Sequence, residues 1–367
     1  MIQHLPVVFR LIGRHDPSRM IRTLSNPWRG RGLDLDAPLP CSDATGVTRL
    51  LERCPAHAPT PLLDLPELAA HAGVARLHVK DERNRMGLGS FKALGAAHAI
   101  ARDAAAAVQG EDWGPALTGH TYVTASAGNH GLSVAAGARL FGAGAVIYLA
   151  ETVPEAFAAR LRAKGARVQR AGASYEASMV AAAQAARENG WTLLSDSSWP
   201  GYCEAPLRVM EGYLQLATEA AAQIDAAPTH ILLQAGVGGL AAAVAAHARA
   251  VWGDAPQIVV VEPEAAPALI ESIRAGRVVT TDGPVSAMGR LDCKTPSLIA
   301  LRGLARDADL FVTISEAEAA AVAALLEDRG LATTPSGAAG LASLLGEVDA
   351  GPDARVLAIL SEGPEND

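Results

Sequence analysis

The chain has 367 residues with a net charge of −8, and 50% of its residues are hydrophobic, 19% charged and 4% aromatic. This composition is typical of a globular protein, and the length predicts two domains. The negative charge disfavours nucleic acid and anionic membrane surfaces as partners.

No apolar run reaches the roughly 20 residues of a membrane span, and residues 1–22 lack the pattern of an export signal. The chain contains four cysteines, which are too scattered for a metal clip or a disulfide framework. They are Cys41, Cys54, Cys203 and Cys293. We therefore expect a cytoplasmic protein without a metal site.

Residues 1–50 are expected to form an irregular N-terminal arm, because residues 23–48 are rich in Pro, Gly, Arg and Asp and show no sustained period. A short helix at 65–72, a strand at 76–80 and an alanine-rich helix at 95–108 follow. Further strands are expected at 121–124, 145–149, 167–170, 192–194, 230–234, 257–262, 310–314 and 355–360. Helices separate most of them, which predicts an α/β fold with parallel sheets and sites at the carboxyl ends of the strands.

Lys92 lies among apolar and small neighbours in Ser90-Phe-Lys-Ala-Leu-Gly95. The chain has 31 basic residues and four lysines, so 27 are arginine, and a lysine kept here is informative. A partly desolvated amine can lose its proton and attack an aldehyde, whereas a guanidinium cannot. Lys92 is a candidate Schiff-base lysine; the alternative is an amphipathic lysine at a helix start.

Two loops have features of binding sites. The turn Gly236-Val-Gly-Gly239 joins a strand to a helix, so free N–H groups and the helix dipole favour a phosphate there, although close helix packing is the alternative. In Ser126-Ala-Gly-Asn-His130, Asn129 and the N–H groups can hold a ring oxygen or a carboxylate, or form an ordinary N-cap. Together with Lys92, the two loops suit a pyridoxal phosphate site.

The chain resembles the fold type II pyridoxal-phosphate enzymes and, within them, the diaminopropionate ammonia-lyases. The matching motifs run in the same order over residues 55–365 and include Val79-Lys-Asp-Glu-Arg83, Ser90-Phe-Lys92, Asp196-Ser-Ser-Trp-Pro-Gly-Tyr202, Leu232-Leu-Gln-Ala-Gly-Val-Gly238, Met288-Gly-Arg-Leu291 and Ser361-Glu-Gly363. The resemblance implies a two-domain α/β fold with twisted, parallel-rich sheets flanked by helices. A small domain of residues 96–204 would be inserted into a large domain made of 51–95 and 205–367.

The resemblance also implies which residues bind the coenzyme and the substrate. The coenzyme ligands would be Lys92, which also shuttles protons; Gly236, Val237, Gly238 and Gly239 at the phosphate; Asn129 at the ring hydroxyl; and Ser361 at the ring nitrogen. The substrate carboxylate would meet Ser126, Gly128 and His130. A serine hydroxyl at the ring nitrogen leaves a moderate electron sink, which favours elimination over transamination.

Asp196 is the second candidate catalytic residue. In the resembling lyases an aspartate of this motif lies near the amino groups of the substrate, and an acceptor there would favour an ammonium leaving group over a hydroxyl. The alternative is a turn or N-cap aspartate. His130 has a structural hydrogen bond as its alternative role, and Lys80, Asp81 and Glu82 are expected to form a solvated strand end.

The implied activity is a carbon–nitrogen lyase that eliminates ammonia from 2,3-diaminopropionate to give pyruvate. Ala127 replaces a carboxylate that commonly serves the D-isomer in these lyases, which predicts preference for the L-isomer. The form of Thr334-Pro-Ser-Gly-Ala-Ala-Gly340 and of the Ser126 loop is nearer to the dehydratases, so a serine, threonine or 3-hydroxyaspartate dehydratase is the alternative. A β-replacement synthase and a coenzyme-free binding protein are further alternatives. A homodimer is usual in such families.

Overall fold

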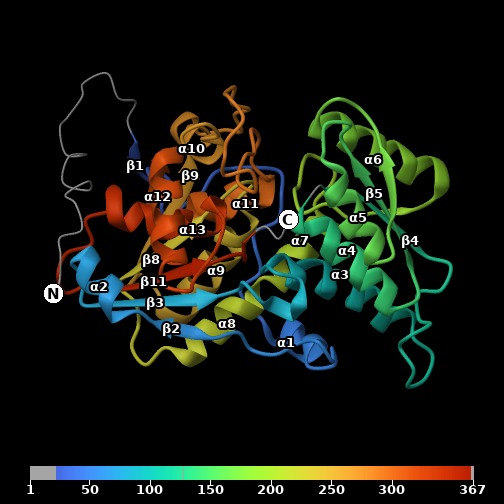
Figure 1. The fold of residues 1–367 in the computed structure, drawn as a ribbon, viewed down its shortest axis with the longest axis horizontal. Helices are drawn as coiled ribbons and strands as arrows, with labels where there is room; N and C mark the ends of the chain where they lie inside the picture. The colour runs from blue at the N-terminus through green and yellow to red at the C-terminus, as the bar shows by residue number, and fades with distance from the viewer. Residues whose placement is uncertain (1–21, 127, 365–367) are drawn as a thin grey trace.

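The computed structural model describes residues 22–126 and 128–364. It contains two sheets that lie side by side along the long axis of the molecule (Figure 1). The strands are β1 (Thr23–Ser25), β2 (Leu62–Asp64), β3 (Arg76–Asp81), β4 (Thr121–Ala125), β5 (Gly144–Leu149), β6 (Arg167–Arg170), β7 (Thr192–Leu193), β8 (His230–Gln234), β9 (Gln257–Pro263), β10 (Leu310–Ile314) and β11 (Arg355–Leu360).

The helices separate most of the strands, as the sequence predicts. They are α1 (Thr45–Leu51), α2 (Pro66–Ala72), α3 (Lys92–Ala107), α4 (Asn129–Leu140), α5 (Glu155–Ala163), α6 (Tyr175–Asn189), α7 (Glu204–Gly212), α8 (Leu214–Gln223), α9 (Gly239–Trp252), α10 (Ala268–Ala275), α11 (Leu298–Asp307), α12 (Glu316–Glu327) and α13 (Pro335–Gly346), with a short 3₁₀ helix η2 (Arg85–Gly87). The predicted strands from 121–124 onward and the helices at 65–72 and 95–108 are confirmed to within a few residues.

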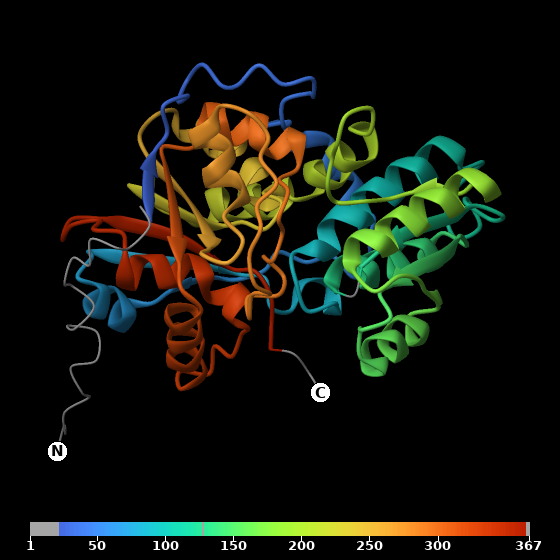
Figure 2. The same ribbon diagram turned by 90° about the horizontal axis from the view of Figure 1, so that it is seen from above.

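The larger sheet has seven strands in the order β1-β10-β9-β8-β11-β3-β2. Its five central strands are parallel, and the two edge strands are antiparallel. In β8, Ile231 and Leu233 belong to the core beneath α8 to α11, whereas Leu232 belongs to the core beneath α2, α12 and α13. Figure 2 shows the helices on both sides of this sheet. Covering on both faces explains why its central strands are near-continuous apolar runs.

The smaller sheet is entirely parallel, in the order β6-β5-β4-β7. Tyr122 and Ile147 face the core that includes α3, α4 and α5, whereas Val123 and Val146 pack against Ala182 and other residues of α6. This sheet and its helices form the green body at the right of Figure 1. The carboxyl ends of its strands lead into the loops that carry Ser126 and Asp196.

The N-terminal arm is more regular than the sequence predicts. Residues 23–25 form β1, which pairs antiparallel with β10, and residues 45–51 form α1. An edge strand of three residues is stabilised by its distant partner, so local periodicity does not indicate it. The short edge strand β2 is missed for the same reason.

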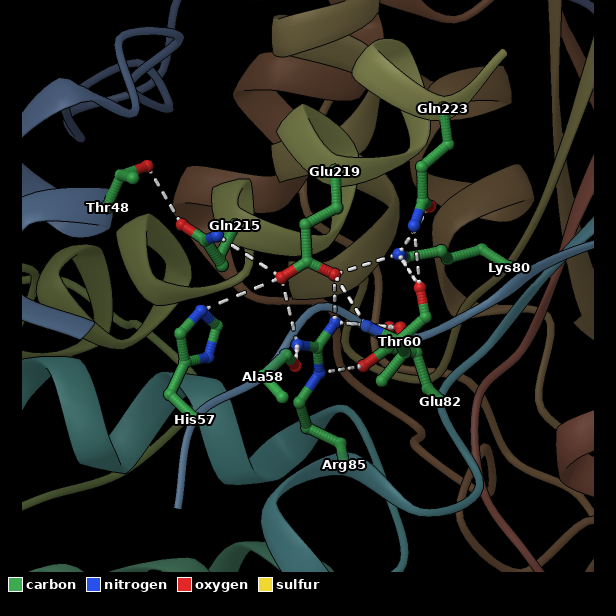
Figure 3. A network of polar contacts seen from close by, with 10 residues as sticks. All are labelled: Thr48, His57, Ala58, Thr60, Lys80, Glu82, Arg85, Gln215, Glu219 and Gln223. Carbon is green, nitrogen blue, oxygen red and sulfur yellow. Dashed lines mark hydrogen bonds and ion pairs between the residues drawn. The ribbon is translucent and has the colours of Figure 1, made fainter. Parts of the chain in front are cut away.

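The end of β3 is buried, and the expectation of a solvated strand end is wrong. Lys80 and Glu82 have no exposed surface, and Asp81 is 8% exposed. Figure 3 shows Lys80 and Glu82 in a closed set of ion pairs with Arg85 and Glu219. Lys80 and Arg85 are both paired with Glu219 of α8, which is distant in the sequence, so the local sequence gives no sign that these charges are buried.

No helix in the described part of the chain is long and apolar enough to cross a membrane. Within residues 22–126 and 128–364, no group of three or more His, Cys, Asp or Glu side chains is arranged to hold a metal ion.

Candidate active site

Lys92 is the first residue of α3. This helix begins at the junction between the part of the chain with the seven-stranded sheet, the larger body, and the part with the four-stranded sheet, the smaller body (Figure 1). The segment before it is tied to the end of β11, because Phe91 N–H donates to the Ser361 carbonyl at 3.0 Å and Ser90 forms an isolated bridge with Glu362. Lys92 and Ser361, which are 269 positions apart in the sequence, therefore lie on adjacent segments.

The Lys92 amine forms an ion pair with the carboxylate of Asp196, which lies in the loop after β7. Burial alone would lower the pKa of Lys92, but the Asp196 carboxylate outweighs it and holds that pKa above its ordinary value. Burial would likewise raise the pKa of Asp196, but the Lys92 charge holds it below its usual range. Both groups are therefore charged in this state, and the structure brings the two predicted catalytic residues into direct contact.

His130 holds the loop that carries Asp196. This residue is 3% exposed, and its Nε2 donates to the Leu194 carbonyl at 2.8 Å. Burial lowers the pKa of His130, so the ring is neutral and has its proton on the nitrogen that donates. Among the described residues the other ring nitrogen has no partner. The geometry favours the structural hydrogen bond for this histidine.

The Ser126 hydroxyl closes its own loop, accepting from Gly128 N–H at 3.2 Å and from Gly131 N–H at 3.1 Å. Gly128 is the residue before α4, and a Cβ at this position would lie 3.1 Å from the Arg290 guanidinium. These contacts place the loop against the larger body and leave little room for a side chain at Gly128.

Asn129 faces the end of β11 across the junction. Its amide donates to the Glu362 carboxylate, which also accepts from the Thr334 hydroxyl. Asn129, Thr334, Glu362 and Arg290 line a cleft of about 470 Å³ between the two bodies. Asn129 and Ser361, the two residues predicted to lie at the coenzyme ring, are thus brought to one region.

The turn from Gly236 to Gly239 leads into α9. A Cβ at Gly236 would lie 3.0 Å from the Cys293 sulfur and 3.1 Å from the Arg290 carbonyl, and Gly238 has φ of +95°. The Val237 carbonyl accepts from Ser297 N–H at 3.0 Å. Close packing and a left-handed backbone explain the glycines, and the free N–H groups at the start of α9 suit an anion.

Sequence reasoning missed two side chains that lie against this site. Tyr213 is 1% exposed and interacts electrostatically with Lys92 and Asp196. Burial raises the pKa of the Cys293 thiol to about 12, so the thiol is protonated. Neither residue stands in a sequence pattern with a chemical meaning, and only the fold brings them to Lys92.

A family model described as "Pyridoxal-phosphate dependent enzyme" matches residues 54–362. The chain is 32% identical to the diaminopropionate ammonia-lyase of Salmonella typhimurium over 73% of this chain and 72% of that protein. It is 31% identical to the diaminopropionate ammonia-lyase of Escherichia coli K12 over 88% of each chain. The chain belongs to the pyridoxal-phosphate-dependent enzymes.

The structure agrees with that family. The crystal structure of the Escherichia coli diaminopropionate ammonia-lyase in complex with an aminoacrylate–pyridoxal phosphate azomethine intermediate matches with a TM-score of 0.83 at 29% identity, over 93% of each chain. The same Escherichia coli enzyme in complex with D-serine matches with a TM-score of 0.82. The fold type II architecture predicted from the sequence is confirmed.

The residues present fit pyridoxal phosphate, the coenzyme of the family. An amine that can bind an aldehyde lies at Lys92, and a glycine turn that admits an anion lies at the start of α9. The buried Tyr213 hydroxyl has no hydrogen-bond partner in residues 22–126 and 128–364, which indicates a polar group that the protein itself does not supply.

Proposed function

We propose that the chain is an ammonia-lyase that acts on L-2,3-diaminopropionate and releases pyruvate and two molecules of ammonia. The observation that carries this proposal is the partly buried carboxylate of Asp196, which is ionised and touches the Lys92 amine. The similarity to proteins named diaminopropionate ammonia-lyase supports it.

Lys92 would hold the coenzyme and, once the substrate amine has displaced it, take the proton from the α-carbon. Bound pyridoxal phosphate supplies an electron sink that makes this proton acidic. We propose Gly236, Val237, Gly238 and Gly239 as phosphate ligands, with Asn129 and Ser361 at the ring. Ser126 and Gly128 would set the position of the substrate carboxylate directly, and His130, which donates to the Leu194 carbonyl, would contribute by holding the neighbouring loop.

Asp196 would select the leaving group. A carboxylate that stays ionised attracts a β-ammonium group and offers nothing comparable to a neutral hydroxyl. While Lys92 holds the coenzyme or acts as a neutral base, Asp196 would lack its cationic partner, and a second ammonium on the substrate would restore the pairing. A diamino acid would therefore satisfy a partly buried charge that serine leaves unpaired.

The proposed preference for the L-isomer rests on Ala127, which lies outside the residues that the structure describes.

Glu362, whose carboxylate is fixed by Asn129 and Thr334, belongs to the same cleft as the proposed ring site. It is engaged by donors rather than available as a base.

The experiment that tests this function measures ammonia and 2-oxo acid release by the coenzyme-loaded protein. The substrates are L- and D-2,3-diaminopropionate, L-serine, L-threonine and threo-3-hydroxyaspartate. We expect L-diaminopropionate to have the highest kcat/KM and the D-isomer to be inert. Asp196→Asn should lower kcat/KM for diaminopropionate by about 100-fold and for L-serine by less.

Asp254→Asn is the matched control, because Asp254 is an exposed aspartate paired with Arg29 far from the site, and its kinetics should equal those of the wild type. If the Asp196 variant loses activity equally on amino and hydroxy substrates, leaving-group selection by Asp196 is wrong. If only the D-isomer result differs from expectation, the lyase assignment stands and the Ala127 argument is wrong.

A hydroxyamino-acid dehydratase is the second candidate. The side chain of Thr334 caps α13 in the dehydratase-like Thr334-Pro335 segment, and the human L-serine dehydratase/L-threonine deaminase is 29% identical over 297 residues. A clearly higher kcat/KM with L-serine or L-threonine in the same assay would favour this function.

We further propose a cytoplasmic homodimer. The four cysteines are free thiols in the structure, which is what a reducing compartment maintains. Sedimentation of the holoenzyme measures the assembly, and a monomer at micromolar concentration would contradict the dimer.

A further inference from the structure

Tyr213 lies between α7 and α8, with its ring wedged between two glycines. A Cβ at Gly95 would lie 2.7 Å from Cε1 and 2.9 Å from Cζ of this ring, and a Cβ at Gly239 would lie 3.6 Å from Cε2. Phe91 packs edge-on against the ring at a centroid distance of 4.9 Å. The hydroxyl end of Tyr213 therefore lies between the start of α3 and the start of α9.

The Tyr213 hydroxyl is buried and has no hydrogen-bond partner among the described residues. A buried tyrosine hydroxyl usually finds a partner, and leaving one unsatisfied costs about 1–3 kcal/mol. Burial holds the pKa of Tyr213 above its ordinary value, so the hydroxyl keeps its proton and is a donor. The site thus holds a neutral donor that lacks an acceptor.

The acceptor is not one of the charged neighbours. Asp196 and Lys92 interact electrostatically with Tyr213, but their short contact is with each other. The first N–H groups of α9 are further donors without intrahelical partners, and they begin at Gly239, which the ring of Tyr213 borders. A buried hydroxyl donor beside a helix N-terminus suits an acceptor that carries several oxygens and a negative charge.

We propose that Tyr213 donates a hydrogen bond to the phosphate group of pyridoxal phosphate and is therefore a ligand of the coenzyme. The proposal rests on the phosphate-binding role proposed for Gly236 to Gly239. It explains why position 95 is a glycine, because a methyl group there would displace the ring that brings the hydroxyl to the start of α9.

The test compares two coenzymes that differ only in the phosphate. Coenzyme-free wild type and Tyr213→Phe are titrated with pyridoxal phosphate and with pyridoxal, following the visible absorbance of the lysine-bound form. We expect Tyr213→Phe to weaken pyridoxal phosphate by about 10- to 100-fold, as for a hydrogen bond to a charged group. The affinity for pyridoxal should change by less than about twofold, because pyridoxal lacks the phosphate group to which Tyr213 would donate.

Tyr122→Phe is the matched control, because Tyr122 is also fully buried but donates to Asp103 at 2.7 Å, in the smaller body. Its affinities for both coenzymes should be unchanged. In the absence of coenzyme, the unfolding temperature of Tyr213→Phe should equal or exceed that of the wild type, because the substitution removes an unsatisfied hydroxyl. The unfolding temperature of Tyr122→Phe should be lower than that of the wild type, because this substitution removes the hydrogen bond to Asp103.

Equal weakening of pyridoxal phosphate and pyridoxal by Tyr213→Phe would overturn the proposal, because the hydroxyl would then act at Lys92 or the ring. Unchanged affinity for both would overturn it as well. Neither result involves a substrate, so failure here is distinguishable from failure of the diaminopropionate lyase function.

Discussion

Two lysines, one fully and one partly buried, lie 12 positions apart in the chain and have opposite surroundings. Lys80 at the end of β3 is completely buried, and its amine contacts the Thr60 carbonyl at 2.7 Å, Glu219 at 2.8 Å and Gln223 at 2.9 Å. Lys92 at the start of α3 retains 19% of its side-chain exposure and is paired with Asp196. Both lysines face a carboxylate, but only Lys80 has three close acceptors around it.

The comparison teaches how one chain separates a structural charge from a reactive one. In the Lys80 cluster, Glu219 is shared with Arg85, whose guanidinium binds both Glu219 and Glu82 at 2.7 Å (Figure 3). Burial therefore lowers the pKa of Lys80 in spite of Glu219, whereas Asp196 raises that of Lys92 in spite of burial. In the Lys80 cluster, Glu219 pairs with both Lys80 and Arg85, so the loss of one residue leaves others without an ion-pair partner. Among the described residues, the Lys92–Asp196 pair has no such shared residue, so Lys92 can leave Asp196 without breaking other ion pairs.

The largest expected effect separates the two lysines by function. Lys92→Ala should lower kcat by about 10⁴-fold, because the residue that holds the coenzyme and moves the proton is lost. It should also remove the visible absorbance of lysine-bound coenzyme, and the protein should stay folded. Arg187→Ala is the control, since this arginine is exposed near the end of α6, outside the cleft, the Lys92 pair and the Lys80 cluster, and the variant should keep wild-type turnover. Residual turnover within tenfold of wild type in the Lys92 variant would contradict the assignment.

The two lysines also mark what sequence could and could not predict. Lys92 became a candidate through its apolar neighbours and the rarity of lysine, and the two loops and the family resemblance led to its prediction as the coenzyme lysine. The strand pattern correctly predicted the parallel pairing that dominates both sheets. Lys80 was interpreted as solvated, because its partner Glu219 is 139 positions away on α8 and no local pattern indicates that pairing. Tyr213 was missed for the same reason, since its meaning comes from the glycines of α3 and α9 around it.

The second prediction breaks the Lys80 cluster. Glu219→Gln should lower the free energy of unfolding by about 3–5 kcal/mol, because Lys80 and Arg85 then share fewer negative partners in a buried site. Urea unfolding with and without coenzyme measures this, and turnover per folded molecule should be unchanged. Glu188→Gln, on the exposed face of α6, is the control and should leave the unfolding midpoint in place. A loss below 1 kcal/mol would mean that the cluster is not structural.

The third prediction concerns how the free energy of unfolding depends on pH through the Glu219 carboxylate. Burial would raise the pKa of Glu219, but Arg85 and Lys80 lower it to about 2 from an ordinary 4.5. Its contribution to stability is therefore complete above pH 4.5 and is lost as pH falls toward 2, by at most ~3 kcal/mol. The difference in unfolding free energy between wild type and Glu219→Gln should shrink over this window. A difference that stays constant from pH 6 to pH 3 would show that Glu219 titrates normally.

The smallest expected effect concerns the packing of α7 against α3, the helix that begins at Lys92. Helices α3 and α7 meet at Gly212, where a Cβ would lie 2.4 Å from the Leu94 carbonyl oxygen and 2.9 Å from the Gly95 Cα. Gly212→Ala should destabilise the protein by about 1–3 kcal/mol through overpacking. Because the strain falls on the first turn of α3, coenzyme affinity should also fall in this variant. Gly190→Ala is the control: position 190 follows the end of α6, a Cβ there would meet no atom of the described residues within 4 Å, and coenzyme affinity should be unchanged. Loss of stability without loss of coenzyme affinity would show that Lys92 is held by Asp196 rather than by its helix.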